Sequence, residues 1–298
     1  MPYVLGIDIG ATTIKGGLIA PGGKIVKSHV HDTESARGRK VVLDNILRCV
    51  ENLWDPRVKA IGVGCPGPLD IEKGIVLKTP NIPLQGVHLR DIIKKRFKVP
   101  VLLENDATAY IYGEACFGSC RKKKNIVGLT IGTGMGGAII IDGKIYRGRG
   151  NAGELGHMSI SYKGIKGKHG HYGELEEYVS LRGVMRHARG LGVETPKDLS
   201  ALAHKGNRKA IAVWKKEGYY LGVAVADLIY AFDPDVVVIG GNIANAWEFF
   251  APEMKRTVKE RVTVPPPPIV KRRLANRAGI LGSGMLALEM ITATKKQK

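Results

Sequence analysis

Asp106 is the acid in this sequence whose surroundings best fit a catalytic role. It stands in the stretch V-P-V-L-L-E-N-D-A-T, where the apolar run at 101–103 predicts a buried strand and a helix is expected from Ala107. Asp106 is therefore expected where a strand ends and a helix begins, at the edge of an open α/β sheet where ligands bind. The alternative is a carboxylate that only caps the helix by accepting backbone N–H groups. Glycine-rich loops elsewhere in the chain favour the catalytic interpretation.

Three glycine-rich loops, at 10–13, 132–137 and 240–241, each follow an expected buried strand. Glycines let the backbone approach phosphate groups, and consecutive N–H groups together with threonine hydroxyls supply hydrogen-bond donors. Asp8 lies in the first of these strands, V-L-G-I-D-I-G, where it could hold Mg²⁺ through water molecules. Its alternative is a buried, hydrogen-bonded carboxylate. The pattern predicts a nucleotide-phosphate site.

The elements that position these loops occur twice. Residues 126–132, I-V-G-L-T-I-G, match residues 4–10 position by position, with Thr130 in the place of Asp8. Each copy continues into a glycine loop, a strand, a tight turn and another strand. The repeat predicts a duplicated fold in which two related domains face each other, and the alternative is a chance similarity of glycine-rich hairpins.

Further strands and helices complete two α/β domains. We expect a small domain at 1–110, a large domain at 111–282, and a helix at 283–298 that returns to the small domain. Apart from the two repeats, strands are expected at 58–64, 101–103, 235–239 and 269–273, and helical segments at 41–54, 89–97, 175–188, 196–232, 246–262 and 279–293.

The composition is that of a globular protein, with 44% hydrophobic and 24% charged residues among 298. No apolar stretch reaches the roughly 20 residues of a membrane helix, and Asp8 interrupts the region where a signal peptide would be apolar. The four cysteines lack C-x-x-C spacing, which indicates reduced thiols. We therefore expect a cytoplasmic protein with no membrane partner.

The net charge of +19 indicates attraction of an anionic ligand. The basic residues are dispersed, and no dense run is interleaved with aromatic residues as in a single-strand binding platform. We therefore expect a nucleotide and no nucleic acid as partner. Only two glutamines occur beside 46 Lys and Arg residues, which indicates a thermophilic source.

Together the motifs resemble those of the ROK sugar kinases, in the actin-like ATPase superfamily that includes hexokinases. The resemblance covers essentially the whole chain and implies a two-domain actin-like ATPase (ribonuclease H-like) fold of duplicated βββαβαβα units with a cleft between them. The matching motifs are G-I-D-I-G-A-T at 6–12, C-P-G-P at 65–68, T-P-N at 79–81, E-N-D-A at 104–107, G-T-G-M-G-G at 132–137, E-L-G-H at 154–157, L-E-E-Y-V-S at 175–180 and D-P-D-V-V-V-I-G-G at 233–241.

The resemblance implies transfer of the γ-phosphate of ATP, with Mg²⁺ as cofactor, to a hexose, with glucose 6-phosphate for glycolysis as the product. Asp106 would be the general base, a role that contributes about 10²–10⁴-fold. The implied sugar ligands are Asn81, Asn105, Asp106, Glu154, His157 and Glu176. The implied phosphate-binding residues are Asp8, Gly10, Thr12, Thr13, Lys15, Gly132, Thr133, Gly134, Gly240 and Gly241, with Asp8 also holding Mg²⁺ through water.

One departure concerns zinc. Members of the family usually carry a cysteine-rich zinc knuckle, but Gly167, His169 and Glu174 occupy the three cysteine positions here, and His157 would be the remaining ligand. A structural zinc site needs four ligands, and glycine cannot supply one from a side chain. We expect no zinc. The alternative is a metal held by His157, His169 and Glu174, with His171 nearby.

Other departures leave the substrates open. The first loop reads G-A-T-T where G-G-T-K is common, and the tryptophan usual after T-P-N is missing from 82–87. An N-acetylhexosamine kinase, a fructose kinase and a polyphosphate-dependent glucokinase are alternatives. A sugar-sensing ROK regulator is disfavoured, because such regulators carry an N-terminal helix-turn-helix domain and the phosphate motif here begins at residue 6. We expect a homodimer that binds a sugar and a nucleotide.

Overall fold

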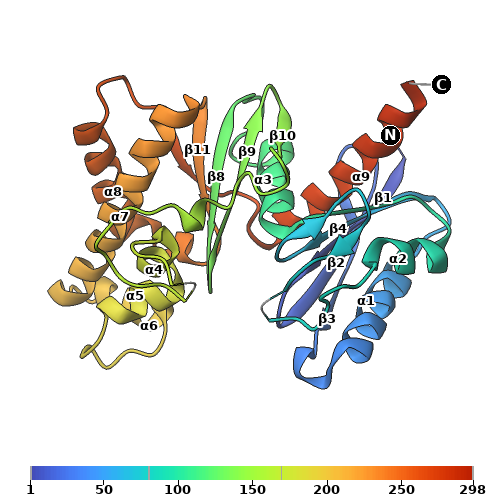
Figure 1. Ribbon diagram of the computed structural model, residues 1–298, viewed down its shortest axis with the longest axis horizontal. Helices are drawn as coiled ribbons and strands as arrows, with labels where there is room; N and C mark the ends of the chain where they lie inside the picture. The colour runs from blue at the N-terminus through green and yellow to red at the C-terminus, as the bar shows by residue number, and fades with distance from the viewer. Residues whose placement is uncertain (1, 80, 169, 297–298) are drawn as a thin grey trace. The chain divides into compact units, whose positions relative to one another are not determined.

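The computed structural model describes residues 2–79, 81–168 and 170–296, which form two compact units (Figure 1). Unit 1 contains the chain up to Lys122, Arg147–Asn151 and the chain from Arg273 onward. Unit 2 contains Lys123–Tyr146 and Ala152–Arg272. These limits differ from the expected division at 110 and 283, because the helix that begins at Asp106 runs on to Phe117 and packs against the C-terminal helix in unit 1.

Unit 1 is built on a mixed sheet of five strands in the order β3-β2-β1-β4-β7. The first three strands form the expected antiparallel meander, and β1, β4 and β7 are parallel. The carboxyl ends of the parallel strands therefore lie at one edge of the sheet. The strands are β1 (Tyr3–Ile9), β2 (Thr13–Ile19), β3 (Ile25–Asp32), β4 (Val58–Cys65) and β7 (Val101–Asn105), with a small separate ribbon of β5 (Leu69–Asp70) and β6 (Ile75–Val76).

Helices cover both faces of this sheet (Figure 1). Alternate residues of β1 point to opposite faces, so Leu5 and Ile7 belong to one core with residues of α1 and α2, while Val4 belongs to another with residues of α9. The close approach of α9 requires glycine in two strands, because a Cβ at Gly6 or Gly62 would lie within 2 Å of a carbonyl oxygen of α9. The helices are α1 (Arg39–Leu53), α2 (Leu89–Phe97), α3 (Asp106–Phe117) and α9 (Ala278–Lys296), with short helices η1 (Ser35–Arg37) and η4 (Ala275–Arg277).

Unit 2 repeats the sheet of unit 1. Its strands follow the order β10-β9-β8-β11-β12, so that β8, β9 and β10 form the meander and β11 and β12 run parallel to β8. The shared order confirms the predicted duplication. The strands are β8 (Ile126–Ile131), β9 (Met135–Ile141), β10 (Lys144–Tyr146), β11 (Val236–Gly240) and β12 (Ile269–Lys271).

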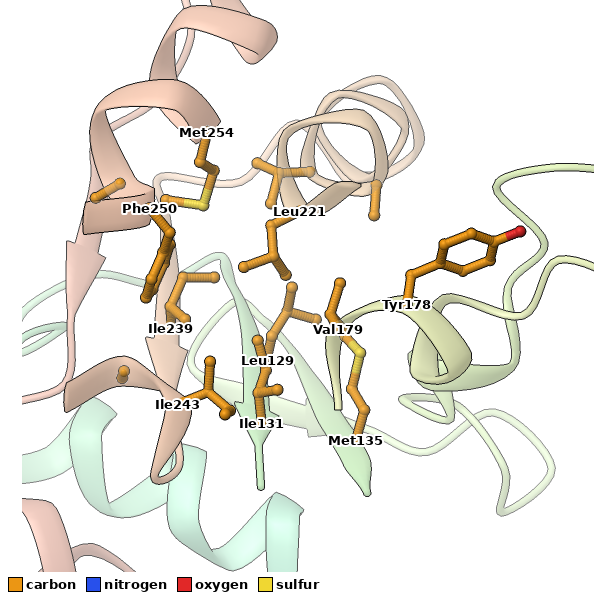
Figure 2. Packing of buried hydrophobic residues seen from close by; sticks show 14 of the residues in the cluster. Leu129, Ile131, Met135, Tyr178, Val179, Leu221, Ile239, Ile243, Phe250 and Met254 are labelled. Carbon is orange, nitrogen blue, oxygen red and sulfur yellow. The ribbon is translucent and has the colours of Figure 1, made fainter. Parts of the chain in front are cut away.

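The helices of unit 2 pack on this sheet around a core in which Leu129 and Ile131 meet Leu221 and Phe250 (Figure 2). The predicted helix at 175–188 is two helices, because Ser180 has an extended backbone that breaks it. The helices are α4 (Leu175–Val179), α5 (Leu181–His187), α6 (Pro196–His204), α7 (Arg208–Phe232) and α8 (Trp247–Arg261), with η2 (Leu155–His157) and η3 (Ile243–Ala246).

Two further predictions on unit 2 needed correction. The helical segment at 196–232 is interrupted, because Asn207 accepts N–H bonds from Lys209 and Ala210 and so starts a new helix, α7. The second glycine loop is shorter than predicted, because β9 already begins at Met135. Among the described residues, none of the helices is both long enough and apolar enough to cross a bilayer.

Candidate active site

The first group of candidate residues lies at the carboxyl edge of the unit 1 sheet. In the strand register Asp8 of β1 pairs with Gly64 of β4, and Gly64 pairs with Glu104 of β7. Gly64 also adjoins Asp106, since a Cβ added to Gly64 would lie 3.5 Å from the Asp106 Cα atom. Asp8 and Asp106 therefore lie at the same edge of one sheet, with β4 between β1 and β7.

Asp106 is the first residue of α3, but Asn105 is the cap of that helix. The side-chain oxygen of Asn105 accepts the N–H of Thr108 at 3.1 Å, whereas Oδ1 of Asp106 accepts the N–H of its neighbour Ala107 at 2.9 Å. Burial, and next the nearby Asp106 carboxylate, raise the pKa of Cys65. The capping interpretation therefore applies to Asn105, and the half-buried Asp106 carboxylate lies beside the end of β4.

Asp8 faces Lys15 across the β1–β2 pair and also adjoins the first turn of α9. A Cβ on Gly279 would lie 2.7 Å from Oδ2 of Asp8. Burial raises the pKa of Asp8, and the Lys15 ammonium opposes this effect. A carboxylate at this position fits Mg²⁺, which proteins commonly hold through one or two carboxylates, water and substrate phosphates.

The loop between β1 and β2 is held by its carbonyl groups. The buried Thr33 donates its hydroxyl to the carbonyl of Gly10 at 2.6 Å, and Ser35 donates to that of Ala11 at 2.8 Å. The N–H of Thr33 also donates to the carbonyl of Thr12 at 2.8 Å. These bonds fix the backbone of the loop, on which Thr12 is exposed.

Glu104 is a buried acid next to the candidate base. Its Oε2 accepts two hydrogen bonds from Arg147, from Nε at 3.1 Å and from Nη2 at 2.5 Å, and its Oε1 accepts the N–H of Asn105 at 3.0 Å. The Arg147 guanidinium offsets the cost of burying this carboxylate. The pair joins Arg147–Asn151 to β7 within unit 1.

The T-P-N motif also belongs to unit 1. Gly67, in the loop after β4, has a φ of +92°, and a Cβ there would lie 2.1 Å from the carbonyl oxygen of Lys78. The C-P-G-P loop and the chain that leads to Asn81 are therefore in contact, and Asn81 is exposed. Pro80 lies outside the described residues.

The second group of candidates lies at the carboxyl edge of the unit 2 sheet. Thr130 of β8 pairs with Gly240 of β11, which places the loop at 132–134 beside Gly241. Gly241 has a φ of +78°, and a Cβ there would lie 2.1 Å from the carbonyl oxygen of Ile131, so no other residue fits. Arg272 donates from Nε to the carbonyl of Gly241 at 3.0 Å and so holds this turn.

Glu176 of α4 reaches this second loop. Its Oε2 accepts the N–H of Met135 at 2.9 Å, and its Oε1 accepts a hydrogen bond from Nζ of Lys168 at 2.9 Å. Burial raises the pKa of Glu176, but the bonds from Lys168 and Met135 together lower it below its ordinary value. Both oxygens of this predicted sugar ligand are thus bonded to the protein itself.

His157 lies between two carboxylates. Its Nδ1 is 2.9 Å from Oε1 of the buried Glu174, and its Nε2 is 3.9 Å from Oε2 of Glu154. A Cβ on Gly167 would lie 2.3 Å from Oε2 of Glu174, so this position packs closely on the carboxylate. The described residues contain no group of three His, Cys, Asp or Glu side chains that could hold a metal ion. His169 lies outside them, so the absence of zinc stays a prediction.

The ROK family model matches residues 4–290 of the chain. The chain belongs to the ROK family. It is 33% identical to the glucokinase of Thermotoga maritima over an alignment of 310 positions, which covers 97% of this chain and 98% of that enzyme. It is 30% identical to the xylose repressor of Bacillus subtilis, with 87% of this chain and 69% of the repressor covered.

Two solved ROK structures have the same fold. A ROK glucokinase from Streptomyces griseus in complex with glucose and AMPPNP matches with a TM-score of 0.84 and 29% identity, over 96% of this chain and 99% of that one. A ROK hexokinase from Thermus thermophilus matches with a TM-score of 0.84 and 31% identity, over 98% and 99%. The fold of this ROK protein is therefore the actin-like ATPase fold that the motifs predicted.

The predicted site residues of this ROK protein divide between the units, and each unit gathers its own members at one sheet edge or on the elements beside it. The roles assigned to them stay predictions. Unit 1 carries Asp8, Gly10, Thr12, Thr13, Lys15, Asn81, Asn105 and Asp106, and unit 2 carries Gly132, Thr133, Gly134, Glu154, His157, Glu176, Gly240 and Gly241.

Sequence reasoning missed the residues that hold these groups in place. Thr33, Arg147, Lys168 and Arg272 each bond a candidate residue or its immediate neighbour. Glu104 is the sequence feature that could have indicated a partner such as Arg147, because a glutamate in a buried strand favours a nearby cation. The remaining partners carry no comparable signal in the sequence.

Proposed function

We propose that this ROK protein is an ATP-dependent hexokinase that converts glucose to glucose 6-phosphate. The observation that carries the proposal is the position of the Asp106 carboxylate at the β7–α3 junction, on the same sheet edge as Asp8 and the loop at 10–13. An acid and a phosphate loop on one sheet edge suit proton transfer and phosphate binding in a single site. The similarity to ROK glucokinases over almost the whole chain supports the same activity.

In the proposed mechanism Asp106 accepts the proton of the sugar hydroxyl as its oxygen attacks the γ-phosphorus of ATP. The bond from that phosphorus to the β,γ-bridging oxygen breaks, and ADP leaves. Phosphoryl transfer depends mainly on positioning and charge neutralisation. Asp8 would hold Mg²⁺, which neutralises phosphate charge when it is bound. The backbone of the loops at 10–13 and 132–134 and the Lys15 ammonium would bind the phosphate groups.

The sugar ligands of the proposal are Asn81, Asn105, Glu154, His157 and Glu176. The amide nitrogen of Asn105 would donate to a hydroxyl, because its oxygen caps α3. Glu154 and His157 are both partly exposed, so that their polar groups can reach a ligand. The proposal also includes a homodimer and a cytoplasmic role at the entry to glycolysis, in a thermophilic organism.

A substrate panel with Mg-ATP tests the proposal. Release of ADP is measured with glucose, mannose, fructose and N-acetylglucosamine at equal concentrations, and we expect the highest kcat/KM with glucose. Polyphosphate in place of ATP tests the donor, which the charge of +19 makes a specific second candidate. Absence of turnover with every hexose and both donors would contradict the proposal.

A sugar-binding regulator is the candidate from another class, because relatives of this chain include the xylose repressor of Bacillus subtilis. Calorimetry with the same sugars shows whether a sugar binds, and release of ADP shows whether it is phosphorylated. A regulator binds a sugar without consuming ATP, whereas the proposed kinase binds glucose and releases ADP in equal amounts with the phosphorylated product.

A further inference from the structure

The loop at 132–134 is held at both ends by the helical pair α4–α5. The N–H of Leu181, the first residue of α5, donates to the carbonyl of Gly132 at 2.8 Å. At the other end the N–H of Met135 donates to Oε2 of Glu176 in α4 at 2.9 Å. The extended backbone at Ser180 turns the chain between these two contacts. The break in the predicted helix at 175–188 therefore brings two anchor points to one loop.

Glu176 makes the stronger of these anchors. Glu176 is 8% exposed. A hydrogen bond from an N–H to a buried carboxylate is about twice as strong as one between neutral groups. The carboxylate also packs on the loop, since a Cβ on Gly134 would lie 2.9 Å from Oε2 of Glu176. A side chain at position 134 would displace the carboxylate that holds Met135.

The second oxygen of Glu176 connects the same carboxylate to another part of unit 2. Nζ of Lys168, in the basic loop at 161–173, lies 2.9 Å from Oε1, while Arg182 lies at 3.9 Å and instead bonds the neighbouring Glu177. Lys168 is 45% exposed, so its ion pair can exchange with solvent or with a ligand hydroxyl. The bond to Met135 uses the other oxygen and is independent of this exchange.

We propose that Glu176 is a positioning residue for the phosphate loop at 132–134, and that this one carboxylate serves two ligands, a sugar at Oε1 and, through the loop, a nucleotide. The inference rests on the proposed function, because it assigns the loop to ATP and Oε1 to the sugar. A sugar hydroxyl that replaces Lys168 at Oε1 leaves Oε2 on Met135 and keeps the loop ordered. Loss of the carboxylate removes both contacts together.

Amide hydrogen exchange on the ligand-free protein tests the positioning role without reference to activity. In Glu176→Ala we expect exchange at the Met135 amide to accelerate by roughly ten- to a hundredfold, the loss expected for one hydrogen bond to a charged group. The amides of Leu129 and Val237, in the core strands, should keep their wild-type rates. Lys168→Met is the matched control, because it removes the ion pair and leaves the Met135 bond, and its Met135 amide should exchange as in the wild type.

Kinetics test the two roles of the carboxylate. We expect Glu176→Ala and Gly134→Ala each to raise the KM for ATP about tenfold, and Lys168→Met to alter the KM for glucose while leaving the KM for ATP within about twofold. A Met135 amide that stays protected in Glu176→Ala overturns the inference. So does a rise in the KM for glucose alone, which would make Glu176 a sugar ligand only.

A general loss of folding is recognised by faster exchange at Leu129 and Val237. In that event Glu176→Met, which keeps the length of the side chain but lacks the carboxylate oxygens, replaces Glu176→Ala in both measurements and must show the same selective change at Met135. A wild-type chain that phosphorylates no hexose overturns the proposed function and the role of Glu176 toward the sugar. The exchange rates at Met135 still decide whether Glu176 positions the loop.

Discussion

Units 1 and 2 build the same five-stranded sheet but use different side chains to hold the loop after its first strand. In unit 1 hydroxyl groups of Thr33 and Ser35 bind the carbonyls of the loop, and the acid Asp8 stands in the strand itself. In unit 2 a carboxylate from a helix, Glu176, binds an amide of the loop, and the strand carries the neutral Thr130. The duplicated backbone is thus retained while the charge has moved from the strand to a helix beside the loop.

One buried acid of unit 2, Glu217, differs from the buried acids of unit 1. Glu104 and Glu114 of unit 1 both have partners, Arg147 for the former and the N–H groups of Ser119, Arg273 and Leu274 for the latter. Glu217 of unit 2 is buried, and neither of its oxygens has a hydrogen-bond partner among the described residues. The comparison predicts that acids support function and folding in unit 1, whereas one acid of unit 2 opposes folding.

Asp106→Asn, which removes the candidate base of unit 1, is expected to have the largest effect on activity. We expect kcat to fall by about 10²–10⁴-fold, because the amide cannot accept the proton of the sugar hydroxyl. Glucose affinity by calorimetry and the thermal midpoint should remain near wild type, since Asn105 and not Asp106 caps α3. The exposed Asp91→Asn is the control. A variant with wild-type kcat would remove Asp106 from its assigned role.

Glu114→Ala tests the acid that ties α3 to the chain before α9. Its two oxygens accept backbone N–H bonds from Ser119, Arg273 and Leu274, all of which would lose a charged acceptor. We expect the free energy of unfolding to fall by about 3 kcal/mol, measured by urea denaturation. Glu289→Ala, on the more exposed part of α9, is the control and should cost less. Equal losses in the two variants would contradict the prediction.

Asp8→Asn and Thr130→Val compare the matched positions of the two first strands. We expect Asp8→Asn to lower kcat/KM for Mg-ATP by roughly ten- to a hundredfold, because the carboxylate would bind the metal, and Thr130→Val to change it by less than about threefold. Raised Mg²⁺ concentrations should recover part of the loss in Asp8→Asn. If the two variants lose activity equally, the strand acid has no special role.

Glu217→Gln is expected to stabilise unit 2. Burial raises the pKa of Glu217 well above its ordinary value, so the folded chain binds this proton more tightly than the unfolded chain. The free energy of unfolding must then fall as the pH rises from about 4.3 through the raised value. The variant should remove this slope and gain about 1–3 kcal/mol at pH 8 but little at pH 4. If the free energy of unfolding depends on pH in the same way in wild type and variant, the pKa of Glu217 is not raised in the folded chain.

The sequence was sufficient to predict the repeated sheet because its signal is local. The match of I-V-G-L-T-I-G to V-L-G-I-D-I-G fixed the equivalence of β1 and β8, and the pattern at 89–97 predicted α2 with its observed bounds. The break at Ser180 was missed, because both sides of it are helical and the contact made there, Leu181 N–H to Gly132, is a tertiary one. Local periodicity cannot register such a contact.

The same distinction applies to the candidate site. Asp8, Asp106 and the glycine loops were predicted as site residues because their types and strand-end positions are visible in the sequence. The contacts that hold the candidate site were not predicted, since Arg147 is 43 residues from Glu104 and Glu176 is 41 residues from Met135. Residues so far apart in the sequence meet only through the strand order of the folded unit, which local sequence patterns do not give.

The closing of unit 1 by α9 has a consequence for how the chain is made. The first 122 residues carry the sheet, but Val4, Ile19 and Ala60 are covered by apolar residues of α9, from the other end of the chain. During synthesis from the N-terminus this sheet face stays open until the last helix emerges, whereas Lys123–Arg272 need only Arg147–Asn151 to loop out before unit 2 is complete. Residues 2–122 are therefore translated before the helix that completes their sheet, and the apolar face stays exposed until α9 has been made.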